Sequence, residues 1–296
     1  MYSERSADME FINLDHLVKG AIDFHMHPGP TPGPCRLDAI EAARQAQQAG
    51  MKAIVLKSHS YTAAVASIVS RLVPGIEVIG SICLNYEVGG LNFHAVLNAA
   101  GLGAKVVWMP TFSAANSINK MRALGLPLEG DGISLLDESG KLVPEMERIL
   151  SIIKEKEMVL ATGHISPGET FVLVEEAIRA GIRKIVITHP TDQEFSENHF
   201  TMDDLQKLAK TGAFIEFTLI GILPNEFCHD PAQLVKTIRT IGPKQCIVST
   251  DLGQPQNLLP VEGMRLFIAT LLRHGITQDE VELMIKKNPA MLLDIG

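Results

Sequence analysis

Residues 21–27, Ala21-Ile22-Asp23-Phe24-His25-Met26-His27, combine a buried-strand pattern with two histidines placed two residues apart. Side chains two apart on a strand point the same way, so His25 and His27 face one side. Further short apolar runs follow along the chain at 53–57, 77–82, 105–109, 158–162, 184–188, 213–217 and 246–250. Most are rich in Val and Ile and apolar on both faces, which is typical of strands covered by helices. The sequence therefore predicts eight buried strands.

Segments with helical periodicity separate these strands. They lie at 37–48, 62–72, 91–100, 144–156, 168–179, 202–210 and 231–241, and 261–274, 278–287 and a closing turn from Pro289 follow the last strand. Glycines after these segments can stop a helix, and Asp38, Thr201 and Thr277 can cap helix starts. The alternation predicts one α/β domain over residues 1–296, a (β/α)8 TIM barrel. A doubly wound open sheet is less favoured, because no G-x-G-x-x-G follows the first strand.

The connection after the fourth strand, residues 112–143, is long and polar. Loops of this length are uncommon in compact domains unless they cover or line a binding site. Two interpretations are equally favoured: a lid over the site and a plain surface insertion.

Composition narrows the class of protein. The chain is 46% hydrophobic and 20% charged, with a formal net charge of -8, so a folded protein is expected and nucleic acid is not an expected partner. The four cysteines form no C-x-x-C pair and are expected to be reduced thiols. No apolar run has the length of a signal peptide or a membrane span. We therefore expect a cytoplasmic protein that acts on a small molecule without a membrane partner.

Polar residues that can bind metal follow several of the predicted strands. The carboxyl ends of barrel strands meet at one mouth, where active sites form. The candidates are His25 and His27 after the first strand, His164 after the fifth, His189 after the sixth and Asp251 after the eighth. A lone histidine is more often structural, and that interpretation is kept for His16, His94, His199, His229 and His274. Four imidazoles with a carboxylate suit one or two divalent ions, zinc first, with Mn, Fe or Ni as alternatives.

The order of these motifs resembles the amidohydrolase superfamily of metal-dependent TIM-barrel hydrolases. The resemblance rests on H-x-H after the first strand, single histidines after the fifth and sixth, and Asp251 after the eighth. The segment 288–293, Asn-Pro-Ala-Met-Leu-Leu, is also similar to that superfamily's C-terminal helix. The resemblance implies that the four histidines bind metal. It further implies that Asp251 is the catalytic residue, which ligates metal and exchanges the proton of the attacking water.

One position departs from that pattern. Binuclear members usually have a carboxylated Lys or a Glu after the fourth strand, where this chain has Trp108, Met109, Pro110 and Thr111, none of which can bridge two metals. Lys57 ends the second strand instead. It has three interpretations: a carboxylated bridging ligand, a cation for a substrate carboxylate or phosphate, or a salt-bridge partner. His59 can be a further ligand, a substrate contact or a loop residue, and a substrate contact is favoured.

The segment 27–34, His-Pro-Gly-Pro-Thr-Pro-Gly-Pro, is stiff and extended. It forms either a pocket wall that leads to Arg36, a candidate substrate-binding residue, or only a rigid connector.

The combined pattern predicts a metal-dependent hydrolase for a C–N or C–O bond of an amide, lactone or ester. A divalent metal lowers the pKa of bound water to about 7 and so supplies hydroxide at neutral pH. The alternatives are a metal-dependent decarboxylase on the same scaffold and a catalytically silent binding barrel. The sequence does not indicate the oligomeric state, although many barrels of this kind form a homo-oligomer.

Overall fold

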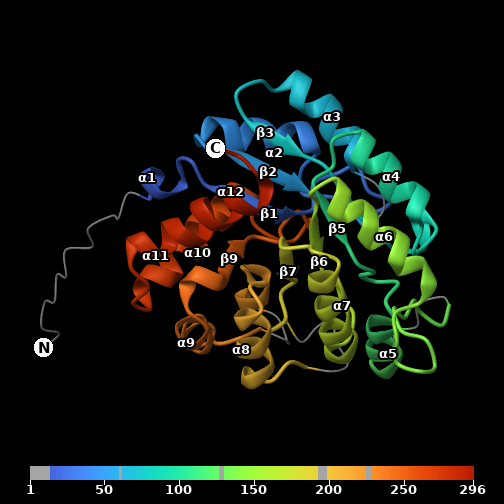
Figure 1. Ribbon diagram of the computed structural model, residues 1–296. Helices are drawn as coiled ribbons and strands as arrows, with labels where there is room; N and C mark the ends of the chain where they lie inside the picture. The colour runs from blue at the N-terminus through green and yellow to red at the C-terminus, as the bar shows by residue number, and fades with distance from the viewer. Residues whose placement is uncertain (1–13, 60–61, 127–129, 193–198, 225–227) are drawn as a thin grey trace, which may run out of the picture.

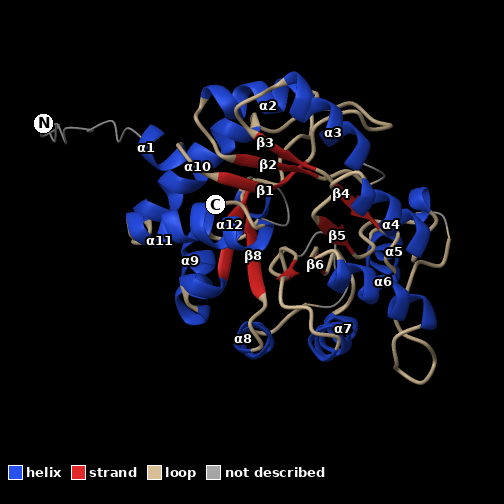
Figure 2. Cartoon of the chain, turned by 45° about the horizontal axis from the view of Figure 1, so that its top comes forward, coloured by secondary structure: helices blue, strands red, loops and turns tan. Residues whose placement is uncertain are grey.

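The computed structural model describes residues 14–59, 62–126, 130–192, 199–224 and 228–296, in which helices surround a central set of strands (Figures 1 and 2). The strands are β1 Ile22–Met26, β2 Ala53–Leu56, β3 Glu77–Ile79, β4 Ser81–Cys83, β5 Val106–Trp108, β6 Val159–Ala161, β7 Ile185–Ile187, β8 Phe214–Thr218 and β9 Cys246–Ser249. Each predicted strand is present, and the third is divided into β3 and β4 at Gly80. A Cβ atom at Gly80 would lie 2.7 Å from the Ala63 Cα, so glycine allows a helix to approach the strand closely there.

The strands pair in parallel and in sequence order. One sheet has the order β1-β2-β3 and the other runs from β4 to β9. Backbone hydrogen bonds join the two ends of this series: Asp251 N donates to His25 O at 2.8 Å, and His27 N donates to Leu252 O at 2.7 Å. A doubly wound sheet would reverse its strand order at a switch point. The sequential order therefore confirms the predicted (β/α)8 barrel and not the open sheet.

The helices agree closely with the predicted segments. They are α1 Asp15–Val18, α2 Ala39–Gln48, α3 Ala63–Leu72, α4 Phe93–Gly101, α5 Ala115–Ala123, α6 Pro144–Glu155, α7 Pro167–Arg179, α8 Met202–Lys210, α9 Pro231–Ile241, α10 Pro260–Arg273, α11 Gln278–Glu282 and α12 Asn288–Leu293. A π-helical turn, Leu283–Lys287, joins α11 to α12. Asp38, Thr201 and Thr277 each form a capping box, in which the side chain accepts from a free backbone amide of the first helical turn.

Helix α5 lies within the connection 112–143, which the sequence indicated only as a long polar segment. Two of its polar residues, Asn116 and Ser117, are buried against the barrel mouth, and the Asn116 side chain donates to His164 O at 3.0 Å. Farther along, the Leu135 amide donates to the Glu169 carboxylate of α7 at 2.8 Å. The sequence left a lid and a plain surface insertion equally favoured, and these contacts hold the segment against the barrel.

The barrel interior is closed at its amino-terminal end by the last residues of the chain. Leu292, Leu293 and Ile295 belong to the same buried apolar cluster as Phe24 and Trp108, which line the inside of the barrel. Three lysines that directly precede strands contact the chain terminus: Lys52, Lys105 and Lys184. Of these contacts, the Lys105 Nζ donates to the Leu293 carbonyl at 2.5 Å. The amino-terminal end is thus built for stability, and the opposite end is left for a site.

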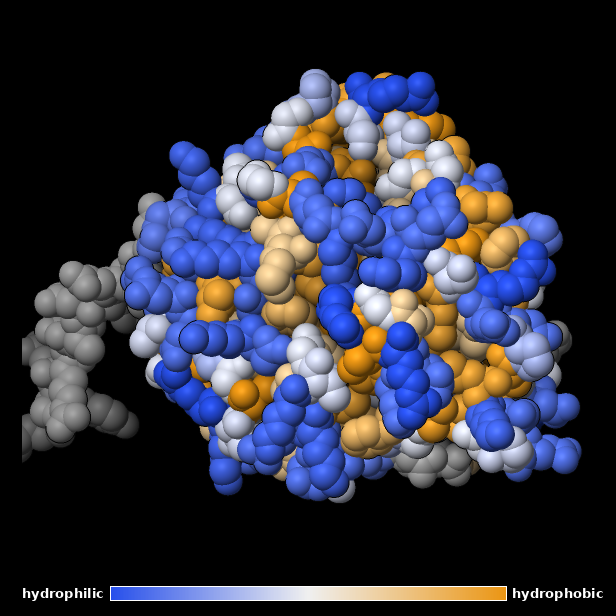
Figure 3. All heavy atoms as spheres, in the orientation of Figure 1, coloured by the Kyte–Doolittle hydropathy of each residue, from blue (hydrophilic) through white to orange (hydrophobic). Residues whose placement is uncertain are grey.

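The face shown in Figure 3 is largely hydrophilic, with apolar residues in small groups between polar ones. Such scattered exposed apolar residues are ordinary for a folded protein. Within the described ranges, we find no helix with the length and apolar character that a bilayer crossing demands.

The closing role of α12 predicts unequal effects of two substitutions on that helix. Leu293 is fully buried, whereas Met291 is 57% exposed. We expect Leu293→Ala to lower the free energy of unfolding by about 2–5 kcal/mol, because it leaves a cavity in the barrel interior. Met291→Ala should change it by no more than about 0.5 kcal/mol. Urea unfolding followed by circular dichroism measures both, and equal losses would contradict the packing of α12 into the barrel.

Candidate metal centre

The hydrogen bonds that join β1 to the chain after β9 also bring the first predicted ligands together. His25 lies on β1, and His27 and Asp251 follow β1 and β9. The Asp251 Oδ1 lies 3.1 Å from His25 Nε2 and 2.9 Å from His27 Nε2. The two Nε2 atoms are 3.2 Å apart. Residues more than 220 positions apart in the sequence therefore present their ligand atoms to one point.

The other two predicted ligands lie at the same mouth. His189 Nε2 is 3.9 Å from Asp251 Oδ2. Ligand atoms of His25, His189 and Asp251 all lie within 4.8 Å of one another, and the three residues are buried. The His164 ring lies one step farther out, with its centre 5.1 Å from that of His189. All five predicted ligands thus converge, and His25, His189 and Asp251 form the tightest group.

An unusual backbone conformation directs the side chains of His189 and Asp251 toward the cluster. His189 and Asp251 have φ values of 23° and 56°, a region that non-glycine residues rarely adopt and that is enriched at functional sites. Gly253 follows closely, and a Cβ atom there would lie 1.9 Å from the His27 carbonyl oxygen. Glycine at this position lets the loop after β9 pass directly against β1, which keeps Asp251 beside the two histidines.

Lys57 and His59 extend this group from the end of β2. The Lys57 Nζ lies 2.8 Å from His25 Nε2 and 4.8 Å from the centre of the Trp108 ring, and Lys57 is only 1% exposed. Both the bridging and the substrate-binding predictions need the amine at such a position. His59 stacks on His27 with ring centres 4.9 Å apart.

Glu216 on β8 is a site residue that the motif analysis missed. Both of its carboxylate oxygens lie 3.2 Å from His25 Nδ1, and the Ser249 hydroxyl donates to one of them at 2.9 Å. A carboxylate at Nδ1 holds the proton on that nitrogen and leaves Nε2 as a lone-pair donor toward the cluster. A single acidic residue inside the otherwise apolar run 213–217 was the available signal.

Two further partners of the predicted ligands were also missed. Asp192 accepts from the Thr218 hydroxyl at 2.8 Å, and its carboxylate lies 3.7 Å from His189 Nδ1. The Ser117 hydroxyl of α5 lies 3.2 Å from His164 Nδ1. Asp192 lies only three residues after His189, so its position beside a predicted ligand was an available signal. Ser117 lies 47 positions from His164, and no local pattern indicates that contact.

Burial and charge set the protonation states of the cluster. Burial lowers the pKa of His27 and of His189 to about 4. Burial would raise the pKa of Asp251, but the charge of His25 and hydrogen bonds from His25 and His27 outweigh it and hold that pKa well below its usual range. For His25, burial lowers the pKa, yet the negative charges of Asp251 and Glu216 outweigh burial and raise it. Neutral imidazoles and an ionised carboxylate are the forms that bind divalent metal, so the donor set fits such an ion once His25 loses its proton.

A cavity of about 530 Å³ opens above these residues. His27, Lys57, His59, His164 and Asp251 line its base. Its walls come from Phe112 and from residues 31–35, 220, 223–224 and 253–257. The proline-rich segment therefore forms a wall of the cavity.

Arg36 follows the proline-rich wall but lies outside the cavity lining. Its side chain is exposed, while its backbone amide donates to Gly253 O at 2.7 Å. Substrate binding by Arg36 stays a prediction.

Solved structures with similar folds include the probable dipeptidase PvdM from Pseudomonas aeruginosa, with a TM-score of 0.65, 12% identity and coverage of 95% of this chain and 96% of that one. An amidohydrolase from Pseudomonas aeruginosa has a TM-score of 0.63 and 13% identity, and the match covers 94% of this chain and 97% of that one. The organophosphorus hydrolase from Deinococcus radiodurans has a TM-score of 0.57 and 16% identity, and the match covers 93% of this chain and 92% of that one. At such identities the likeness concerns the fold alone, and it agrees with the TIM barrel that the sequence predicted.

The sequence itself defines a narrower group. Residues 20–216 match a family model described as a family of unknown function (DUF6282), and the chain belongs to that family. No curated protein matches the sequence. The match includes His25, His27, His164 and His189, and Asp251 lies beyond it.

The contact between Glu216 and His25 predicts weaker metal binding when the carboxylate is removed. We expect Glu216→Gln to lower the affinity for Zn²⁺ by about 10–100-fold, because the amide orients the imidazole less firmly and makes it less basic. Glu77→Gln, at the exposed start of β3, is the matched control and should bind like wild type. Chelator competition measures the affinities. Unchanged affinity in a folded Glu216→Gln protein would show that the carboxylate does not support His25.

Proposed function

We propose that this protein is a metal-dependent hydrolase that cleaves a C–N or C–O bond of a small amide, lactone or ester. The observation that carries the proposal is the convergence of His25, His189 and Asp251 within 4.8 Å, together with a cavity of about 530 Å³ that Asp251 lines. Proteins with this fold that are named as hydrolases support the reaction class. Metal-dependent decarboxylation and a silent binding barrel are the rivals.

The residues that would hold a divalent ion, zinc first, are His25, His27, His164, His189 and Asp251. When bound, such an ion lowers the pKa of water and polarises a substrate carbonyl.

The protein itself supplies a base, an orienting partner and a shaped pocket. The Asp251 carboxylate is ionised and lies at the cavity base, so an oxygen of this group can accept a proton and return it to the leaving group. Glu216 retains the proton on His25 Nδ1, which fixes the ring while the substrate reacts. The walls of the cavity hold the substrate above the cluster and restrict water. These roles account for hydrolysis better than for a silent barrel, which needs no ionised base beside its ligands.

The proposal predicts that hydrolysis depends on the Asp251 carboxylate and does not depend on an exposed aspartate elsewhere. We expect Asp251→Asn to reduce hydrolysis by about 100–10,000-fold, because an amide cannot accept the proton. Asp203→Asn, at an exposed position of α8, should retain full activity. A panel of amides, lactones and esters is assayed by base titration, and CO2 release is followed in parallel. CO2 without hydrolysis would replace the proposal by decarboxylation.

Elemental analysis of the wild-type protein and of Lys57→Ala tests the metal content and the role of Lys57. Two metal equivalents in wild type that fall to about one in Lys57→Ala would support a bridging carboxylated lysine. One equivalent in both proteins would assign Lys57 to the substrate instead. Absence of bound metal after reconstitution with zinc, manganese, iron and nickel would refute the metal-dependent hydrolase.

A further inference from the structure

The cavity above the metal cluster has two chemically different walls. Gln254, Gln256 and Asn257 provide uncharged amides after β9, and the neighbouring loop after β8 provides the apolar Ile220 and Leu223. The amides are organised: Gln254 Nε2 donates to the Asp251 carbonyl at 2.8 Å, and Asn257 Nδ2 donates to Gln254 Oε1 at 2.9 Å. A chain of amides thus leads from the Asp251 backbone along the loop after β9, and a ligand can hydrogen-bond to this loop while its hydrocarbon contacts the apolar residues of the neighbouring loop.

Cationic side chains are nearly absent from this cavity. Among the described lining residues, Lys57 is the one lysine or arginine. Its Nζ lies at the base, 2.8 Å from His25 Nε2, and so belongs to the reacting end. The internal segments outside the described residues, 60–61, 127–129, 193–198 and 225–227, contain no lysine or arginine in the sequence.

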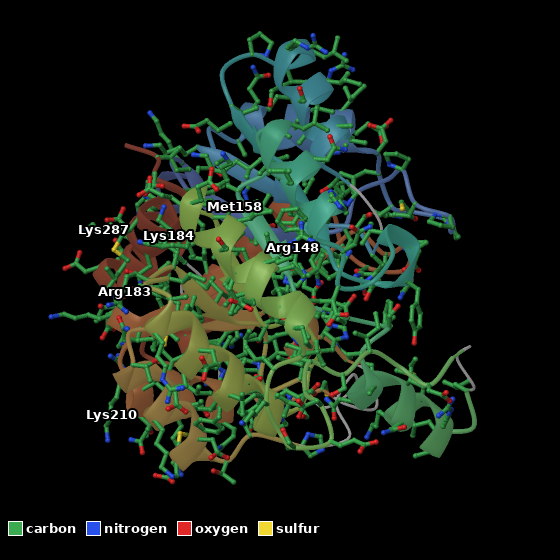
Figure 4. All side chains as sticks on the ribbon, turned by 45° about the vertical axis from the view of Figure 1, so that its right-hand side comes forward. Arg148, Met158, Arg183, Lys184, Lys210 and Lys287 are labelled. Atoms are coloured by element: carbon green, nitrogen blue, oxygen red, sulfur yellow. The ribbon has the colours of Figure 1, made fainter. Side chains whose placement is uncertain are left out.

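Four basic side chains lie far from the cavity. In Figure 4, Arg183, Lys184, Lys210 and Lys287 lie along one side of the molecule. Lys184 directly precedes β7 and contacts Asp294 of the chain terminus, so this side is the amino-terminal end of the barrel. These cations are therefore at the end opposite the cavity and cannot reach a bound substrate.

A negatively charged group on the remote part of a substrate would find no cationic side chain among the described residues of the cavity walls. Moving a carboxylate or phosphate from water into a pocket of amides and hydrocarbon costs free energy unless a cation or several donors pair with it. An uncharged amide, hydroxyl or carbonyl loses less hydration and can exchange hydrogen bonds with the glutamine and asparagine side chains.

From these walls we infer that the cavity selects a substrate whose non-reacting part is uncharged and combines hydrogen-bonding groups with hydrocarbon. A substrate with a second carboxylate or a phosphate remote from the scissile bond is rejected. The inference rests on the proposed hydrolase for the reacting end, and on the cavity lining alone for the remote end.

Matched substrates test the inference on the zinc-loaded full-length protein. The pair is an alkyl δ-lactone with a terminal carboxamide and the same lactone with a terminal carboxylate. We expect kcat/KM to be about 100-fold higher for the carboxamide, because the carboxylate is left without a cationic partner. Equal values, or a preference for the carboxylate, would overturn the inference.

A cavity variant makes the test specific. Gln256 is exposed at the rim, so Gln256→Lys should fold, and it places a cation beside the remote end of the substrate. We expect this variant to reduce the preference for the carboxamide by about tenfold. Gln256→Met has a similar size without charge and should keep the preference. A preference unchanged in Gln256→Lys would place the remote group away from this wall and would contradict the inference.

Binding separates this inference from the proposed reaction. Two alkyl hydroxamates with the same metal-binding group, one with a carboxamide tail and one with a carboxylate tail, are titrated calorimetrically into the zinc-loaded protein. Tighter binding of the carboxamide, by about 100-fold, supports the inference even when no lactone is hydrolysed, and then only the proposed hydrolysis fails. Tighter binding of the carboxylate, or binding of neither tail, overturns the inference.

Discussion

The two hydrogen bonds between β1 and the chain after β9 fix the geometry on which the site depends. They join His25 to Asp251 and His27 to Leu252 through backbone atoms. The same contacts complete the ring of strands and set the side chains of His25, His27 and Asp251 against one another. Gly253 is required at this junction because any side chain would collide with the His27 carbonyl. Barrel closure and assembly of the candidate metal centre are therefore one event, and a shift in strand register would lose both.

Around this junction, two buried acids hold imidazole rings in place. Glu216 pairs with His25, and Asp192 lies near His189. Each acid sits on the side of its histidine that faces away from the cluster centre, so it holds the ring without competing for the shared point. Burial keeps most of the imidazoles neutral, while the ionised Asp251 supplies negative charge. A divalent cation is the partner that such a combination of neutral nitrogens and carboxylates suits best.

The two ends of the barrel carry different demands. At the amino-terminal end, Leu292 and Leu293 fill the interior and lysines contact the chain terminus. At the carboxyl end, Phe112 and the proline-rich segment stand over the metal cluster and leave space between them. Positive side chains at the first end and a cavity nearly without them at the second follow from this division. Packing at the filled end stabilises the fold. This stability offsets the strained backbone conformations of His189 and Asp251 at the open end.

Local patterns in the sequence were sufficient for the strands, most helices and the converging ligands. Apolar runs and helical periodicity act over a few residues, and parallel strands bring their carboxyl ends together whatever lies between them. Tertiary structure alone decided which polar groups support the ligands: Glu216 lies 191 positions from His25. It also buried the polar face of α5 beside His164 and placed the Lys57 amine among the ligand atoms. These outcomes depend on barrel register and side-chain packing, which arise only when distant segments meet.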